Sequence, residues 1–132
     1  MKKTTKLIAL FLVFLTALSC NKSAGTGGSA TLKGQVYAYN YSKSFVLSDS
    51  GYLGGQKIYI IYGDGTGVSN NTETDNDGRF EFQYLRRGKY QVYVFSKKLH
   101  NASLDSTIIQ LCEIKTKNEI KELPLFIVNT IK

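Results

Sequence analysis

The sequence contains a single histidine, His100, and only two cysteines, Cys20 and Cys112. His100 lies in a polar segment near Asp105 and several serines, but no nucleophile motif and no second base accompany it. A Ser-His-Asp arrangement, or a metal site built on one histidine and one cysteine, is therefore not expected. No pair of titratable groups is placed for acid–base or nucleophilic work, so the sequence predicts no enzyme, no catalytic residues, no metal and no cofactor.

Helix signals and basic runs are lacking as well. No segment repeats apolar residues at the i, i+3, i+4 and i+7 positions with caps at its ends, so helices are not expected. The net charge is +7, and it becomes +4 when Lys2, Lys3 and Lys6 are removed with the N-terminal segment. The remaining lysines are scattered along the chain, which indicates a solvated surface and no nucleic-acid partner.

The N-terminal segment is typical of an export signal. Residues 1–6 hold three lysines, and an apolar run follows over residues 7–18. This run is too short to span a bilayer as a helix. We therefore predict a signal peptide over residues 1–19 that is removed from the mature protein.

The end of this segment, Ala17-Leu18-Ser19-Cys20, resembles a bacterial lipobox and is similar to the Leu-Ser-Cys endings of Bacteroidetes lipoproteins. The resemblance implies a lipoprotein in which Cys20 carries lipid, such as palmitate, and anchors the protein to a membrane of the cell envelope. No acidic cluster follows Cys20, which by the same resemblance favours the periplasmic face of the outer membrane. The alternative is an ordinary signal peptide with an incidental cysteine.

Lipidation of Cys20 would leave Cys112 without a partner for an intramolecular disulfide. Cys112 lies in the apolar run 108–114, where we expect it to pack as a small hydrophobic residue and not to act as a reactive thiol. Residues 20–30 are small, polar and rich in glycine, which predicts a flexible tether after the lipidated cysteine. The remaining residues, 31–132, suffice for one domain with one core.

Alternating polar and apolar residues predict strands. The clearest are 79–82 and 89–95, with turn signals at Asp75–Gly78 and at residues 86–88, so we expect these two strands to pair antiparallel. Pro124 is expected at an edge or a bulge because it cannot donate to a strand ladder. The expected strands are 31–41, 44–47, 56–62, 68–74, 79–85, 88–97, 106–114 and 118–128. They predict an all-β fold, a seven- to eight-stranded antiparallel β-sandwich.

The run from Thr74 to Val94 carries a family resemblance. Its sequence, TDNDGRFEFQYLRRGKYQVYV, resembles the pattern T-D-x-x-G-x-F-x-F-x-x-L-x-x-G-x-Y-x-V-x-V of carboxypeptidase regulatory-like domains, collagen-adhesin B-repeats and transthyretin-like sandwiches. Gly34-Gln35-Val36 and the segment 55–60 match the opening strands of those families. The resemblance implies a prealbumin-like sandwich. It implies little about function, because this architecture serves as spacer, binding module or plug.

Strand alternation also assigns side chains to the two faces. We predict the following core: Val36, Ala38, Ile58, Ile60, Tyr62, Phe80, Phe82, Leu85, Tyr90, Val92 and Val94. The opposite phase carries aromatic residues where an exposed sheet would carry Thr, Lys and Glu. This candidate binding face comprises Tyr37, Tyr39, Tyr59, Ile61, Tyr93 and Phe95, with Tyr41 in the same phase. The alternative is that loops or the C-terminal strand cover these residues.

One segment resembles the start of a calcium loop, since Asp75, Asp77 and Gly78 match its first positions. Position 12 would be Arg86, where such a loop needs a bidentate Glu, so a tight turn is expected instead.

Two functions from different classes remain open. The first is a non-catalytic, lipid-anchored envelope module that binds a protein partner or a glycan through its aromatic face. The second is a structural or accessory lipoprotein that acts as a spacer or stabiliser in an envelope assembly.

Overall fold

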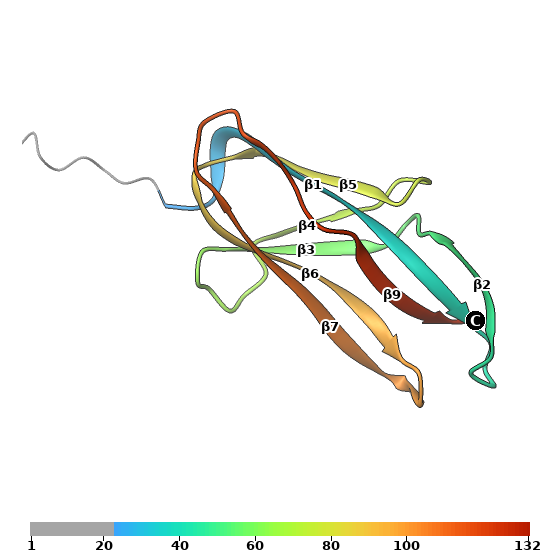
Figure 1. The fold of residues 1–132 in the computed structure, drawn as a ribbon. Helices are drawn as coiled ribbons and strands as arrows, with labels where there is room; N and C mark the ends of the chain where they lie inside the picture. Colours follow the sequence, from blue (N-terminus) through green and yellow to red (C-terminus); the bar gives the residue numbers. More distant parts are fainter. Residues whose placement is uncertain (1–22) are drawn as a thin grey trace, which may run out of the picture.

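A computed structural model describes residues 23–132 of the chain, which form a two-layer β-sandwich (Figure 1). The predicted all-β sandwich is therefore confirmed, and no helix in the described part could cross a membrane. The predicted signal peptide and Cys20 lie outside the described residues. The strands are β1 (Thr26–Tyr41), β2 (Leu47–Tyr52), β3 (Lys57–Tyr62), β4 (Asn70–Glu73), β5 (Arg79–Leu85), β6 (Gly88–Lys98), β7 (Asn101–Ile114), β8 (Ile120–Glu122) and β9 (Phe126–Ile131).

The long strand β1 is the centre of a five-stranded sheet. Its first half pairs with β5 on one edge and β8 on the other, and its second half pairs with β2 and β9 in the same way. The pairings with β8 and β9 are parallel, which corrects the purely antiparallel expectation. After β7 the chain joins this sheet beside Thr31, whose N–H donates to Glu119 O at 2.8 Å, and β8 and β9 then follow β1 in the same direction.

The second sheet has four strands in the order β4-β3-β6-β7, all antiparallel. Strands β5 and β6 therefore do not pair with each other, although the turn between them is short, and the expected hairpin is wrong. The chain instead crosses from one sheet to the other through Tyr84 at φ 59° and Gly88 at φ 146°. This arch lets the apolar faces of β5 and β6 meet across the core, whereas a hairpin would place them side by side.

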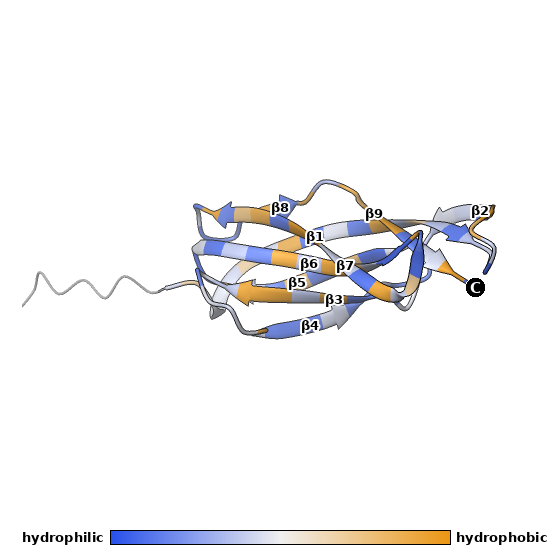
Figure 2. Ribbon diagram, turned by 90° about the horizontal axis from the view of Figure 1, so that it is seen from below, coloured by the Kyte–Doolittle hydropathy of each residue, from blue (hydrophilic) through white to orange (hydrophobic). Residues whose placement is uncertain are grey.

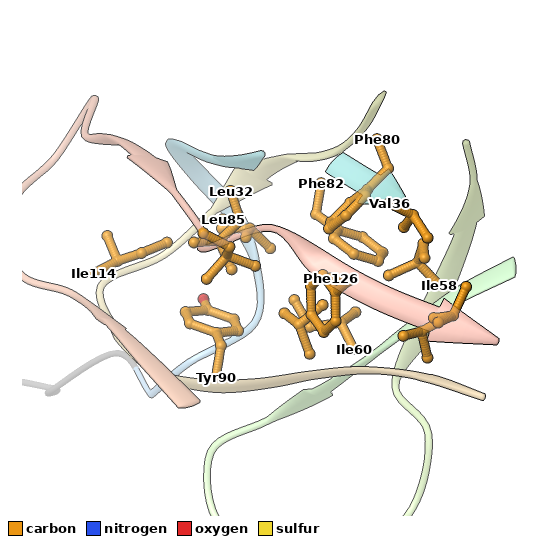
Figure 3. Close-up of a cluster of buried hydrophobic side chains, with 14 of the residues drawn as sticks. Leu32, Val36, Ile58, Ile60, Phe80, Phe82, Leu85, Tyr90, Ile114 and Phe126 are labelled. Atoms are coloured by element: carbon orange, nitrogen blue, oxygen red, sulfur yellow. The ribbon is translucent and has the colours of Figure 1, made fainter. Parts of the chain in front are cut away.

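The core fills the space between the two sheets (Figure 3). Every predicted core residue is buried except Tyr62, which is half-buried and packs against the core. Hydrophobic and hydrophilic residues are interspersed along β6 and β7 in Figure 2, and every second residue is buried in the central part of β6, as a strand with one buried face requires. The structure adds core residues that the alternation did not identify: Ala30, Leu32, Ile114, Leu123, Phe126 and Val128.

The start of β1 corrects the predicted tether. Thr26 is already in the strand, so residues 26–30 belong to the domain. Gly25 is buried, and its N–H donates to the Tyr90 hydroxyl oxygen at 2.9 Å. A Cβ on Gly28 would lie 2.1 Å from the Leu85 carbonyl oxygen, so this glycine permits a close approach of two backbones. Glycine composition alone cannot distinguish such packing from flexibility.

Two strand assignments also differ from the expectation. Strand β2 covers 47–52 instead of 44–47, because residues 42–46 form a turn. In this turn Phe45 adopts φ 59°, and its N–H donates to Ser42 O. The single strand expected over 118–128 is divided into β8 and β9. Pro124 lies between them, as its missing N–H favours.

Candidate functional site

The candidate binding face is divided between the two sides of the sandwich. Tyr37 and Tyr39 lie on β1 in the five-stranded sheet, whereas Tyr59, Tyr93 and Phe95 lie on β3 and β6 in the four-stranded sheet. The inner faces of the sheets meet at the core, so their outer faces point in opposite directions (Figure 1). The predicted residues therefore cannot form one surface, and each group has to be considered separately.

The group on the four-stranded sheet forms a close aromatic cluster. Tyr59 pairs directly with Tyr93 across β3 and β6, and their rings are stacked with centroids 5.0 Å apart and an interplanar angle of 16°. Phe95 meets both rings edge-on, with its centroid 5.6 Å from each. Such offset and edge-on geometries are favourable for aromatic pairs. The three rings therefore stabilise one another and fix a preformed surface.

Strand β7 extends this surface with two aliphatic residues. Ile109 pairs with Tyr93, and Leu111 pairs with Gln91, so both side chains follow the outer face. Ile109 is 53% exposed and Leu111 is 76% exposed. We call this surface the Tyr93 patch, and it consists of Tyr59, Tyr93, Phe95, Ile109 and Leu111. Sequence alternation missed its β7 residues because Ile108 and Ile109 are both apolar, which leaves the phase of the strand open.

Ile61 does not contribute to the Tyr93 patch. It is on the outer face but only 9% exposed, because the loop after β3 lies over it with Gly65 nearby. The Gln91 side-chain amide holds this loop in place by donating to the carbonyls of Gly63 and Gly65 at 3.1 Å and 3.2 Å. The expectation of an exposed Ile61 is therefore wrong, since the loop covers this one position.

A second cluster, which we call the Tyr37 cluster, lies on the outer face of the five-stranded sheet. It consists of Tyr37, Tyr39, Tyr52 and Ile127. The rings of Tyr39 and Tyr52 meet the Tyr37 ring edge-on at 5.7 Å and 5.3 Å, and Ile127 pairs with Tyr37 across β1 and β9. The Tyr37 hydroxyl lies 3.0 Å from Ser50 Oγ, within hydrogen-bonding distance. Tyr52 is 55% exposed, so the cluster offers an aromatic ring to solvent.

Residues 75–78 form a turn, as predicted, and the Asp75 carboxylate accepts hydrogen bonds within it. Asp75 Oδ1 accepts hydrogen bonds from the backbone N–H groups of Asp77 and Arg79, both at 2.9 Å. Gly78 adopts φ 73° to close the turn. Within residues 23–132 no three His, Cys, Asp or Glu side chains are grouped to hold a metal ion.

The remaining candidates for chemistry are dispersed. His100 is exposed in the turn between β6 and β7, where its ring centroid lies 6.3 Å from that of Phe45. Asp105, the carboxylate near it in sequence, instead forms an ion pair with Lys97 at 2.7 Å. An open groove along β1, β4 and β5 is lined by charges of both signs, including Lys33, Arg79 and Glu81.

Cys112 packs against the core as a half-buried residue, as expected for a small hydrophobic side chain. Its thiol donates to Tyr90 O at 3.8 Å. Burial raises the pKa of the Cys112 thiol to about 11. The thiolate is the reactive form of cysteine, so this environment suppresses its nucleophilicity.

This pKa leads to a measurable expectation. At pH 8, the pKa of about 11 leaves Cys112 with about 100-fold less thiolate than a cysteine at the ordinary value of 9.0, so alkylation by iodoacetamide should be slower by about that factor. The rate should rise tenfold per pH unit up to about pH 11. Because folding raises the pKa of the Cys112 thiol, the free energy of unfolding should also fall as the pH rises above about 9. Peptide mapping by mass spectrometry measures the alkylation rate, and unfolded protein is the control. Equal rates in the folded and unfolded protein would contradict the burial of this thiol.

Comparison with known proteins shows similarity at the level of structure. No protein-family model matches the chain, and no curated protein matches it. Among solved structures, the chain is similar to PA1324 from Pseudomonas aeruginosa, a protein proposed to bind carbohydrate, with 12% sequence identity and a TM-score of 0.44. The similarity covers 81% of this chain and 92% of the other.

Proposed function

We propose that the protein is a non-catalytic binding module of the cell envelope and that its Tyr93 patch holds a protein partner. The observation that carries this proposal is the exposed aliphatic and aromatic surface on β3, β6 and β7. Aromatic rings fixed in place beside aliphatic side chains are the usual energetic centre of a protein interface. Lys57 begins β3 and Lys97 lies next to the end of β6, and their ion pairs with Glu73 and Asp105 would contribute to a polar rim.

The ring geometry favours a protein partner over a glycan at this patch. A sugar ring binds an aromatic residue by lying flat on an open ring face. Tyr59 and Tyr93 are stacked on each other, so each already uses one face, and Phe95 meets them edge-on. Ile109 and Leu111 add aliphatic area that a protein side chain can cover. The patch therefore matches apolar contact better than carbohydrate stacking.

The test compares matched variants on the two outer faces. In the full chain, Tyr93→Ser with Phe95→Ser should abolish recovery of the partner after cross-linking in envelope membranes, because aromatic anchors carry most of an interface's energy. The control, Tyr39→Ser with Tyr52→Ser, removes two aromatic rings from the opposite face and should leave recovery unchanged. Melting temperatures of all variants exclude loss through unfolding. Equal recovery by both variants would overturn the proposal and favour the spacer or stabiliser role.

The Tyr37 cluster supports a second candidate function, glycan binding. The rings of Tyr39 and Tyr52 lie at 72° and 87° to the Tyr37 ring, so neither of them is stacked flat against it. Ser50 is adjacent, and its hydroxyl can share hydrogen bonds with a sugar. Binding of envelope polysaccharides to the parent and to the Tyr39→Ser, Tyr52→Ser variant tests this function. Retention that does not differ between the two would exclude this cluster as the glycan site.

The anchor completes the proposal. We expect Cys20 to carry lipid and to place the domain at the periplasmic face of the outer membrane, as the lipobox resemblance implies. Labelled fatty acid should enter the parent protein but not Cys20→Ala, and the variant should leave the membrane fraction. Cys112→Ala is the matched control and should keep both label and location. Label in Cys20→Ala equal to that of the parent would refute the anchor.

A further inference from the structure

Strand β7 is an edge strand without the usual protection against pairing. Among residues 23–132 it pairs with β6 alone, and its other edge is open. Residues 106–112 read Ser-Thr-Ile-Ile-Gln-Leu-Cys and contain no charge, proline or glycine. Natural edge strands are normally short, charged or interrupted, because an open edge pairs with other strands. The edge strand β4 on the other side of the sheet follows this rule, since it has four residues and ends at Glu73.

The open edge presents its backbone groups at the odd-numbered residues. Gly63 N donates to Lys89 O at 2.8 Å, so odd-numbered residues of β6 direct their polar groups toward β3 and even-numbered residues toward β7. On β7, the partners of those even-numbered residues include Gln110 and Cys112. The intervening residues, Ile109 and Leu111 among them, therefore direct their N–H and C=O groups outward.

We propose that β7 pairs antiparallel with β7 of a second copy of this chain, with Ile109 opposite Leu111 of that copy. Pairing of odd-numbered with odd-numbered residues satisfies the outward backbone groups. In this register Asp105, which is ion-paired with Lys97 of its own chain, lies opposite Lys115, the residue that follows β7. An acidic position of one copy then faces a basic position of the other, and both contacts occur twice by symmetry. A shift to Ile109 opposite Ile109 would instead place Asp105 opposite Glu113, which is unfavourable. This complementarity is the argument for a second copy of the chain as the occupant of the edge.

The pairing has a geometric consequence. A two-fold axis perpendicular to the sheet keeps the outer faces of both copies on the same side. The two Tyr93 patches would then form one continuous surface across the two paired β7 strands, where the exposed Ile109 and Leu111 side chains of both copies become neighbours. The pairing itself depends on the backbone edge, so it stands independently of whether the Tyr93 patch binds a partner.

The mass of the full chain tests the pairing. Sedimentation in a detergent matched in density to the buffer should give a dimer that dissociates on dilution. Leu111→Pro should weaken dimerisation by roughly 100-fold, because it removes two outward N–H groups per dimer, and it should retain the fold because β6 does not use this N–H. Leu111→Lys keeps the backbone intact and should also give monomers. Ile120→Lys, at another exposed aliphatic residue on β8, is the control and should remain dimeric.

The register is tested by disulfide trapping in membranes, in full chains with Cys112→Ala. Ile109→Cys mixed with Leu111→Cys should give a cross-linked heterodimer, because directly opposite residues have Cα atoms about 5.5 Å apart. Either variant alone should cross-link poorly, since identical residues are then offset diagonally. A chain that stays monomeric at every concentration, or a dimer that survives both Leu111 substitutions, would overturn the proposal. Cross-linking of Ile109→Cys with itself would overturn the register.

Discussion

Replacement of Gly78 by valine is expected to lower the free energy of unfolding by about 3 kcal/mol. Gly78 has φ 73°, a conformation that a β-branched residue strongly disfavours. A Cβ at this position would also lie 2.5 Å from the Val36 carbonyl oxygen. That oxygen accepts a hydrogen bond from Leu53 N, and Val36 N donates to Gly78 O, so the turn cannot move away without breaking pairing at the centre of β1.

The measurement is thermal and urea unfolding of the purified protein. A loss of about 3 kcal/mol corresponds to roughly 15 °C in the melting temperature of a domain of this size. Gly67→Val is the matched control, because a Cβ there meets no atom within 4 Å and its backbone is not in the left-handed region. It should change the melting temperature by only a few degrees. Equal effects of the two substitutions would show that the Gly78 turn does not have this conformation.

The elements that alternation identifies best are those that bury one face. Phe80 and Phe82 on β5 and Val92 and Val94 on β6 face the core as predicted, because burial of alternate residues is a local property of the sequence. Which strand pairs with which is not local. A short connection predicts a hairpin, but here it leads to the opposite sheet, since the apolar faces of both strands can then contact each other.

The candidate site shows the same limit. Alternation placed Tyr37, Tyr39, Tyr59 and Tyr93 away from the core, but phase does not specify the sheet to which a strand belongs. Tyr37 and Tyr93 share a phase and yet lie on opposite sides of the molecule. Cross-strand neighbours decide the composition of a surface. Leu111 belongs to the Tyr93 patch only because β7 pairs with β6, which the sequence of β7 alone does not reveal.

The glycines before residue 30 are the clearest case of two physical explanations for one composition. A flexible tether and a close backbone contact both require glycine, for entropy in the first case and for space in the second. Thr26 and Ala30 both pair with Leu85, so the residues between them bulge over its carbonyl. Gly25 and Ala24 then pack against Tyr90 and Gly88, which connects this bulge to the core.

Gly28→Ala separates these explanations by the sign of its effect. In a flexible tether, alanine would leave stability unchanged or raise it slightly, because it reduces the freedom of the unfolded chain. In the structure, the new Cβ would lie 2.1 Å from the Leu85 oxygen and 2.7 Å from the Arg86 Cα, so the strand must shift or detach. We expect a loss of roughly 2 to 3 kcal/mol. Unfolding by urea measures it, with Gly67→Ala as the control. Because the clash arises at Cβ itself, Gly28→Val should lower the free energy of unfolding by little more than Gly28→Ala does. If Gly28→Ala left stability unchanged, residues 26–30 would be part of the tether, as the sequence predicted.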